Sequence, residues 1–247
     1  FLDCSCFHGK FTYDIPDELF RIKEDSAFLM STGLSSNVSS VNGAAKIYAG
    51  ATTSNITILK SRRSPRYQPN RGHLFSTTVG FDVPTAAMYR DFGLFTEENG
   101  IFFRLKADGN MYARVESNGI LFKEELITFP FSIDFSKLNI FDIAFQWRGA
   151  GAIFFSAGNP DTGQVELIHT IENLNTLNGV PYLVNPALPC AFRSQNLGDN
   201  EAMFCTCVDI TSEGGSKDEN LLQGVITGSE PSLPSSNNTE FLAFKVN

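Results

Sequence analysis

The sequence predicts an all-β fold, arranged as one antiparallel β-sandwich. Apolar and polar residues alternate over many short segments, and Gly, Asn, Asp and Pro separate these segments. Amphipathic helices do not alternate with them, as a parallel α/β layout would require. A length of 247 residues suits a single sandwich of about a dozen or more strands.

The first quarter of the chain has the weakest strand pattern. Residues 14–20 predict at most one helical turn, and the Ser/Asn/Gly-rich residues 31–42 predict a loop. We expect residues 1–59 to form an N-terminal arm or accessory strands, and residues 60–247 to form the sandwich domain. The early segment holds too many apolar groups for a solvated tail, so we expect it to dock on the sandwich or on a neighbouring subunit. These groups are Phe7, Phe11, Tyr13, Leu19, Phe20, Ile22, Phe28, Leu29 and Met30.

A meander is predicted in the middle of the chain. Residues 101–106 and 110–116 each alternate apolar with polar side chains, and Asp108-Gly109 between them is a turn dipeptide. Asn118-Gly119 supplies a second turn of the same kind before residues 120–122. Two such turns so close together predict three consecutive antiparallel strands.

The clearest single strand is predicted over residues 138–148. Phe141, Ile143, Phe145 and Trp147 share one face, so a slip of one residue would expose four large apolar groups. Further strands are expected at residues 46–49, 55–60, 73–83, 152–156, 165–171, 191–194, 202–210, 224–227 and 240–246.

Charge and composition exclude some classes of function. A net charge of −8 and a pI near 4.9 argue against nucleic acid as a partner. No apolar run approaches the ~18 residues of a membrane-spanning helix, so we expect no membrane insertion. Because the chain begins with Phe1 and shows no signal-peptide pattern, we expect a processed or partial chain. Glycosylation at Asn37, Asn55 and Asn237 would require a eukaryotic secretory route.

Metal ligands are present by type but not by spacing. Cys4, Cys6 and His8 could join Cys205 and Cys207 around zinc, yet structural zinc sites usually separate their cysteines by two to four residues. Buried or terminal free thiols are the favoured interpretation, with a disulfide between the two segments as a further alternative. Oxygen ligands for calcium show no compact Asp-x-Asp run. We therefore expect no metal and no cofactor. The calcium candidates are Asp134, Asp142, Asn159, Asp161 and Asp199.

No catalytic residue is assigned from the sequence. His8, His73 and His169 lie far apart, and no nucleophile elbow, phosphate loop or zinc-protease motif occurs. Sandwich glycosidases need two carboxyls close together, and no single predicted strand carries such a pair on one face. We therefore expect the protein not to be an enzyme. A glycosidase or lyase remains a third alternative, which two carboxyls facing each other in a cleft would revive.

One basic cluster occurs on this acidic chain. Our candidate interface residues there are Arg62, Arg63, Arg66, Tyr67 and Arg71. Arginine offers a planar fork for an anionic partner or an acidic protein surface. The alternative, which we favour, is that these arginines pair with acids of their own domain or solvate the loop.

Two stretches resemble structural proteins of tailed phages and large DNA viruses. The first is Arg66-Tyr67-Gln68-Pro69-Asn70-Arg71-Gly72-His73, which runs into a strand. The second holds Trp147-Arg148-Gly149-Ala150-Gly151, then Asn159-Pro160-Asp161-Thr162-Gly163, His169 and Asn185-Pro186-Ala187-Leu188-Pro189. The resemblance covers about residues 60–212. It implies a concanavalin-like or jelly-roll sandwich on the virion surface.

This resemblance gives the expected function: a non-enzymatic virion structural protein that binds other virion proteins. It would act as a capsid decoration, fibre or tail-associated sandwich, as a homo-oligomer or bound in a lattice. The alternative is a lectin-like module that binds a host surface polysaccharide. In that case Tyr67, Tyr89, Tyr112 or Tyr182 would have to be exposed to stack on sugars.

Overall fold

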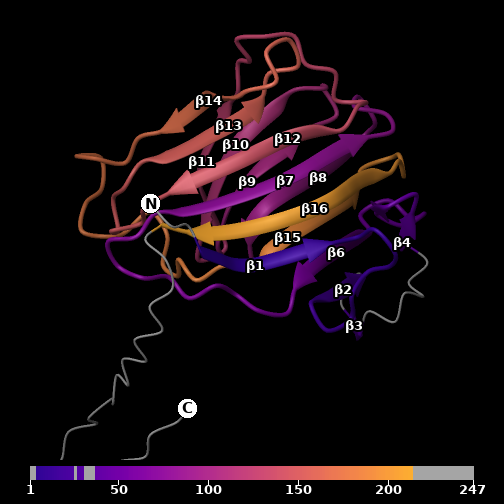
Figure 1. Ribbon diagram of the computed structural model, residues 1–247, viewed down its shortest axis with the longest axis horizontal. Helices are drawn as coiled ribbons and strands as arrows, with labels where there is room; N and C mark the ends of the chain where they lie inside the picture. The colour runs from indigo at the N-terminus through magenta and orange to yellow at the C-terminus, as the bar shows by residue number, and fades with distance from the viewer. Residues whose placement is uncertain (1–3, 25–26, 31–36, 214–247) are drawn as a thin grey trace, which may run out of the picture. The chain divides into compact units, whose positions relative to one another are not determined.

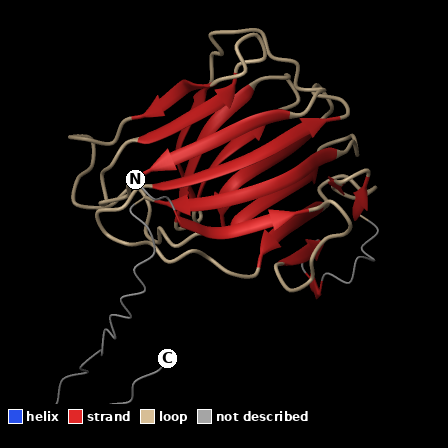
Figure 2. Ribbon diagram, viewed as in Figure 1, coloured by secondary structure: helices blue, strands red, loops and turns tan. Residues whose placement is uncertain are grey.

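The computed structural model describes residues 4–24, 27–30 and 37–213. All regular elements within these residues are strands, so the described part has no helix that could cross a membrane (Figure 2). The strands expected at residues 224–227 and 240–246, and the sequon at Asn237, lie outside the described residues.

The described strands form two antiparallel sheets of eight strands each (Figure 1). Sheet A consists of β1 (Cys4–Lys10), β4 (Val38–Val41), β5 (Ala44–Ile47), β7 (His73–Phe81), β12 (Asn139–Phe145), β13 (Ile153–Gly158), β14 (Val165–Ile171) and β16 (Met203–Ser212). Its order is β14-β13-β12-β7-β16-β5-β4, and β1 also pairs with β16.

Sheet B consists of β2 (Phe20–Glu24), β3 (Ala27–Met30), β6 (Ile56–Ser61), β8 (Met88–Phe95), β9 (Gly100–Leu105), β10 (Met111–Ser117), β11 (Ile120–Leu126) and β15 (Cys190–Asn196). Its order is β11-β10-β9-β8-β15-β6-β2-β3. Consecutive strands β8 to β11 pair in sequence, so the predicted meander is confirmed and extended by one strand.

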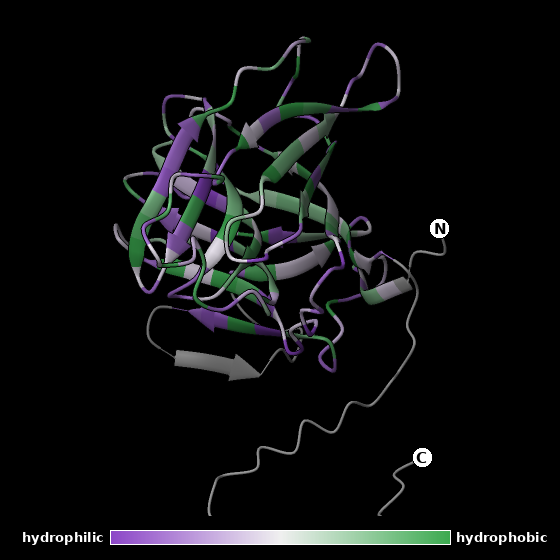
Figure 3. Ribbon diagram, turned by 90° about the vertical axis from the view of Figure 1, so that its left-hand side faces the viewer, coloured by the Kyte–Doolittle hydropathy of each residue, from purple (hydrophilic) through white to green (hydrophobic). Residues whose placement is uncertain are grey.

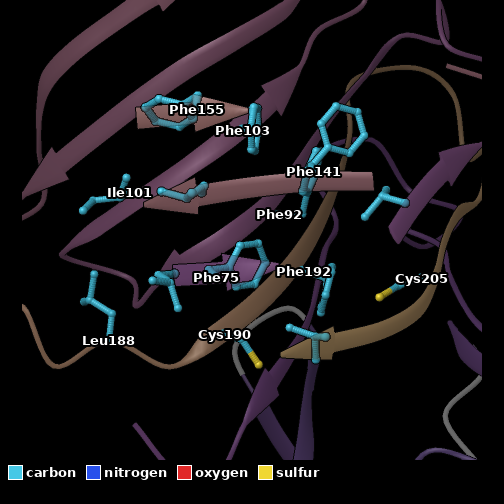
Figure 4. Close-up of a cluster of buried hydrophobic side chains, with 14 of the residues drawn as sticks. Phe75, Phe92, Ile101, Phe103, Phe141, Phe155, Leu188, Cys190, Phe192 and Cys205 are labelled. Carbon is cyan, nitrogen blue, oxygen red and sulfur yellow. The ribbon is translucent and has the colours of Figure 1, made fainter. Parts of the chain in front are cut away.

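One core fills the space between the two sheets, as the alternation of side chains requires. Phe92 and Phe103 of sheet B stack with ring centroids 5.0 Å apart. Phe141 and Phe155 of sheet A contact Phe103 at 5.2 Å and 5.0 Å (Figure 4). Hydrophobic and hydrophilic residues alternate along the strands in Figure 3. The predicted all-β antiparallel sandwich is therefore confirmed.

The strand predicted to continue to Arg148 ends at Phe145. Arg148 has a φ of 40° and Gly149 a φ of 80°, so the chain leaves the sheet in a turn. Trp147 still packs partly buried against the core, and its Nε1 donates a hydrogen bond to the Leu183 carbonyl at 3.0 Å. Period-two patterning identified the face correctly but could not show where the backbone turns.

The first quarter of the chain contributes strands to both sheets. β1 pairs with β16, and β2 pairs with β6. Phe11 and Phe20 are buried with ring centroids 4.9 Å apart, whereas Tyr13 is almost fully exposed. Part of the loop predicted over residues 31–42 is instead β4, which reaches β5 through the positive-φ pair Asn42-Gly43. The domain boundary at residue 59 stays a prediction.

Candidate functional site

The outer faces of the two sheets differ in charge, although both expose large apolar side chains; those of sheet B are Ile120, Leu121 and Leu126 on β11. On sheet B the outward side chains are densely charged. On sheet A they are mostly small, hydroxylic or apolar, and several large apolar side chains there are exposed to solvent. These exposed side chains are Leu74, Ile140, Phe154, Val165 and Leu167.

Asp91 on β8 forms the centre of the charged outer face of sheet B. Its carboxylate is fully buried and accepts hydrogen bonds from Arg104 Nε and Nη2 at 2.7 and 2.8 Å, and from Arg193 Nε at 2.6 Å. Burial alone would raise the pKa of Asp91, but the charge of Arg193 and the hydrogen bond from Arg104 hold it below its usual value. This carboxylate is therefore ionised and fully occupied.

The other carboxylates on the outer face of sheet B are paired in the same way. Glu116 accepts a hydrogen bond from Arg114 Nε at 2.7 Å, and the same guanidinium contacts Glu124. Glu97 lies 3.0 Å from Lys23 Nζ and 3.2 Å from Lys60 Nζ. Burial acts to raise the pKa of Glu97, but these two ammonium groups lower it to about 2. Acids so tightly held by cations do not supply a proton donor for catalysis.

Sheet A carries two carboxyls in one cross-strand row. Asp142 on β12 lies opposite Ser76 on β7, and Ser76 lies opposite Asp209 on β16. Their chain neighbours Phe141 and Ile210 point into the core, so all three row residues point outward. Sequence reasoning missed this pair because the two residues are 67 positions apart and only strand register brings them together.

The spacing of the row suits a pair of acid and base carboxyls. Two strand spacings of about 4.8 Å place the Cα atoms of Asp142 and Asp209 about 10 Å apart. At that Cα spacing, rotation of the two side chains can place the carboxyl groups about 6.5–9.5 Å apart, the separation found in inverting glycosidases. The separation of about 5–5.5 Å used by retaining enzymes would require the acids on adjacent strands.

The two carboxyls have different surroundings. Asp142 is half-buried, and its Oδ1 has no hydrogen-bond partner. Burial raises the pKa of Asp142 above its usual value, although a hydrogen bond with the Ser76 hydroxyl opposes the shift. Asp209 accepts a hydrogen bond from Ser5 Oγ at 2.7 Å and lies 3.9 Å from His8 Nδ1. The more buried carboxyl, Asp142, is therefore the candidate proton donor of the row.

A cavity of about 340 Å³ opens beside this row, at the end of sheet A where β7 begins. Its lining includes Leu74, Ala144 and Thr211, each two residues along its strand from a member of the row. Gly72 follows in the same direction between Gln146 and Glu213, and the Glu213 carboxyl occupies the space where a side chain on Gly72 would begin. Phe154, His73 and Phe145 complete the lining.

The candidate interface residues from the basic cluster do not contribute to this row or cavity. Arg62 Nε donates to the Asp17 carbonyl at 2.5 Å, whereas Arg63 and Arg66 are exposed and Arg71 is half-buried. The Tyr67 ring packs between His73 and Trp147, with centroids at 5.4 and 5.6 Å. A partner for this cluster stays a prediction.

No metal centre is formed by the part of the chain that the structure describes, where no three His, Cys, Asp or Glu residues gather. Cys6, Cys190, Cys205 and Cys207 are reduced and form no disulfide. The register of β1 on β16 places Lys10 opposite Cys207, four residues from Cys6, so no disulfide joins the two segments. Burial raises the pKa of the Cys190 thiol to about 12.

The tyrosines expected to stack on sugars are not free to do so. Tyr182 is fully buried and Tyr67 is half-buried against its neighbours. On the outer face of sheet B, Arg104 covers the Tyr89 ring at 4.8 Å and Lys106 covers the Tyr112 ring at 3.9 Å. On the outer face of sheet A, Phe154 of β13 is instead 41% exposed, beside the cavity.

The chain is similar to known proteins in its three-dimensional structure but not detectably in its sequence. No family model and no curated protein matches the sequence. A glycosyl hydrolase family 16 protein from Mycobacterium smegmatis superposes with a TM-score of 0.57 at 13% identity, covering 84% of this chain and 100% of that one. An endo-acting O-glycanase from the human gut microbiota gives 0.58 at 11%, covering 85% and 100%. A β-1,3-glucanase from Mycobacterium marinum gives 0.55 at 15%, covering 84% and 98%.

These neighbours correct two expectations from the sequence. The jelly-roll sandwich is shared, but the structures that share it are mostly glycosyl hydrolases, so the expected non-enzymatic virion role is wrong. The expectation that the chain is not an enzyme is contradicted by the same neighbours. The stretches behind the viral resemblance lie largely in loops and turns that connect strands of the sandwich.

Proposed function

We propose that this sandwich is a glycoside hydrolase with Asp142 and Asp209 as its catalytic carboxyls. The observation that carries the proposal is their position beside an open cavity, in one cross-strand row in which β7 lies between the two acids. Glycan binding, an alternative from the sequence, is contained in this proposal because hydrolysis requires it.

Each carboxyl has one task in the reaction. Asp142 gives its proton to the glycosidic oxygen as the bond from that oxygen to the anomeric carbon breaks. Asp209 takes a proton from the water molecule that attacks the anomeric carbon on the opposite face of the sugar. The products are two shorter glycans, one with a new reducing end; Asp142 then regains a proton from water and Asp209 releases one to it.

The same face offers a surface for the glycan chain. Phe154 and Ile140 expose apolar groups on which the carbon-hydrogen faces of a sugar ring can pack. Ser76 and Ser156 lie in the row with Asp142 and provide hydroxyls for hydrogen bonds. Glycan sites combine such an apolar surface with a few oriented polar groups.

A substrate screen tests the proposal. The purified intact chain is incubated with neutral α- and β-linked polysaccharides and with O-glycans, and new reducing ends are measured over time. We expect release from at least one glycan class, and loss of that release after heat denaturation. A folded protein, verified by circular dichroism, that releases nothing from the full set and binds none of them would contradict the proposal.

A further inference from the structure

The N-terminal strand β1 brings two side chains to Asp209. β1 pairs with residues 207–212 of β16, and this register places His8 directly opposite Asp209 (Figure 1). The Ser5 hydroxyl donates a hydrogen bond to Asp209 Oδ1 at 2.7 Å. His8 Nδ1 lies 3.9 Å from the same oxygen, beyond hydrogen-bond distance. Ser5 is therefore the residue of β1 that fixes this carboxylate.

A β-bulge in β1 gives Ser5 its position. The pairing of β1 with β16 shifts register between Ser5 and Phe7, so that Ser5 lies opposite Thr211. Phe7 is buried in the core, and in a regular strand Ser5, two residues away, would point to the same side. The additional residue in the bulge turns Ser5 to the outer face of sheet A, where Asp209 lies. Bulges next to active sites re-aim side chains in this way.

The hydrogen bond gives the two oxygens of Asp209 different surroundings. Oδ1 is held by Ser5, and within the described residues no group donates a hydrogen bond to Oδ2. The Phe7 carbonyl is farther from the Ser5 hydroxyl, at 3.4 Å, so the shorter contact to the charged oxygen is the stronger one. Because Oδ1 is held, rotation of the carboxylate is restricted, and Oδ2 is left to accept a proton from water.

We propose that Ser5 is a positioning residue for the catalytic base Asp209, so that β1 belongs to the active site. A base acts efficiently only when its accepting oxygen is held in the right direction. The inference rests on the proposed function, in which Asp209 activates water. It gives the segment over residues 1–59, which we expected to form an arm or accessory strands, a part in the reaction.

Kinetics of Ser5 variants test the inference on the intact chain, with the best substrate from the screen. Ser5→Ala removes the hydroxyl and should lower kcat about threefold to tenfold, the value of one exposed hydrogen bond, with KM and melting temperature unchanged. Ser5→Thr keeps a hydroxyl and should restore most of kcat. Ser132→Ala, the same substitution on the exposed connection between β11 and β12, is the matched control and should keep the parent kcat.

A double variant shows whether Ser5 acts through Asp209. In an Asp209→Asn background no base is left to position, so Ser5→Ala should cause no further loss of kcat. A further loss as large as the loss in the parent protein would show that Ser5 acts on another group and would overturn the inference.

The inference and the proposed function fail separately. If the parent hydrolyses a glycan and Ser5→Ala keeps the kcat of the control, the positioning role is overturned and Asp209 stays the candidate base. A loss in Ser5→Ala that Ser5→Thr does not restore would also overturn the positioning role. A parent protein that hydrolyses no glycan would reject the proposed function, and the inference with it.

Discussion

Replacing Asp91 by Asn should lower the free energy of unfolding by about 3–5 kcal/mol, because it leaves two arginines beside a buried site without their counter-charge. Arg104 and Arg193 are themselves largely buried, and Asp91 is the carboxylate that both contact directly. For a chain of this size the melting temperature should fall by about 2–4 °C per kcal/mol. Thermal unfolding monitored by circular dichroism measures the change.

The control is Asp161→Asn, the same substitution on an exposed turn, which should stay within about 0.5 kcal/mol of the parent protein. The pH dependence gives an independent check. Since the folded protein lowers the pKa of Asp91, its contribution is present above the ordinary aspartate value of about 3.9 and is lost as pH falls below it. A melting temperature for Asp91→Asn equal to that of the control would contradict this role.

Replacing Asp142 or Asp209 by Asn should reduce kcat/KM for the best substrate about 10²- to 10⁴-fold, the usual contribution of a general acid or base. Stability should change little in Asp142→Asn, because burial already favours the neutral form of that carboxyl and asparagine is a neutral isostere. Asp142→Asn should therefore lose activity while its melting temperature stays nearly unchanged, whereas Asp91→Asn should lower the melting temperature. Steady-state kinetics and thermal unfolding on the same samples measure both.

The pH profile identifies the acid. Asp142 must be protonated to act, so the rate should fall as pH rises through its raised pKa, and this alkaline limb should disappear in Asp142→Asn. Asp161→Asn serves again as the control and should keep the full rate and both limbs. If Asp142→Asn kept the parent rate, the assignment of the acid would be wrong.

The sequence predicted correctly those strands in which apolar and polar residues alternate and a typical turn dipeptide follows. Within residues 101–122, apolar and polar side chains alternate along each segment, and turns with positive φ at Gly109 and at Asn118-Gly119 separate the segments. These residues form β9 and β10 and begin β11, as expected. β8 was missed because it carries a charge on each face: Asp91 points outward, while the fully buried Arg90 points inward and donates to the Val83 and Pro84 carbonyls at 2.8 and 2.7 Å. No period-two rule assigns such a strand.

The candidate site could not be predicted from the sequence for a different reason. A search within single strands finds no pair of acids on one face, and Asp142 stood out only as one of five scattered calcium candidates. The site depends on the pairing of β12, β7 and β16, which are far apart along the chain. Register across strands is a property of the whole sheet, so the row became visible only in the folded structure.

The stereochemistry of cleavage tests the central claim most directly. A substrate of known anomeric configuration is hydrolysed in the NMR tube, and the anomeric proton of the first product is observed before mutarotation. Because Asp142 and Asp209 are separated by a full strand, the account predicts inversion at the anomeric carbon. A first product with retained configuration would require two closer carboxyls and would contradict the assignment of Asp142 and Asp209 as the catalytic pair.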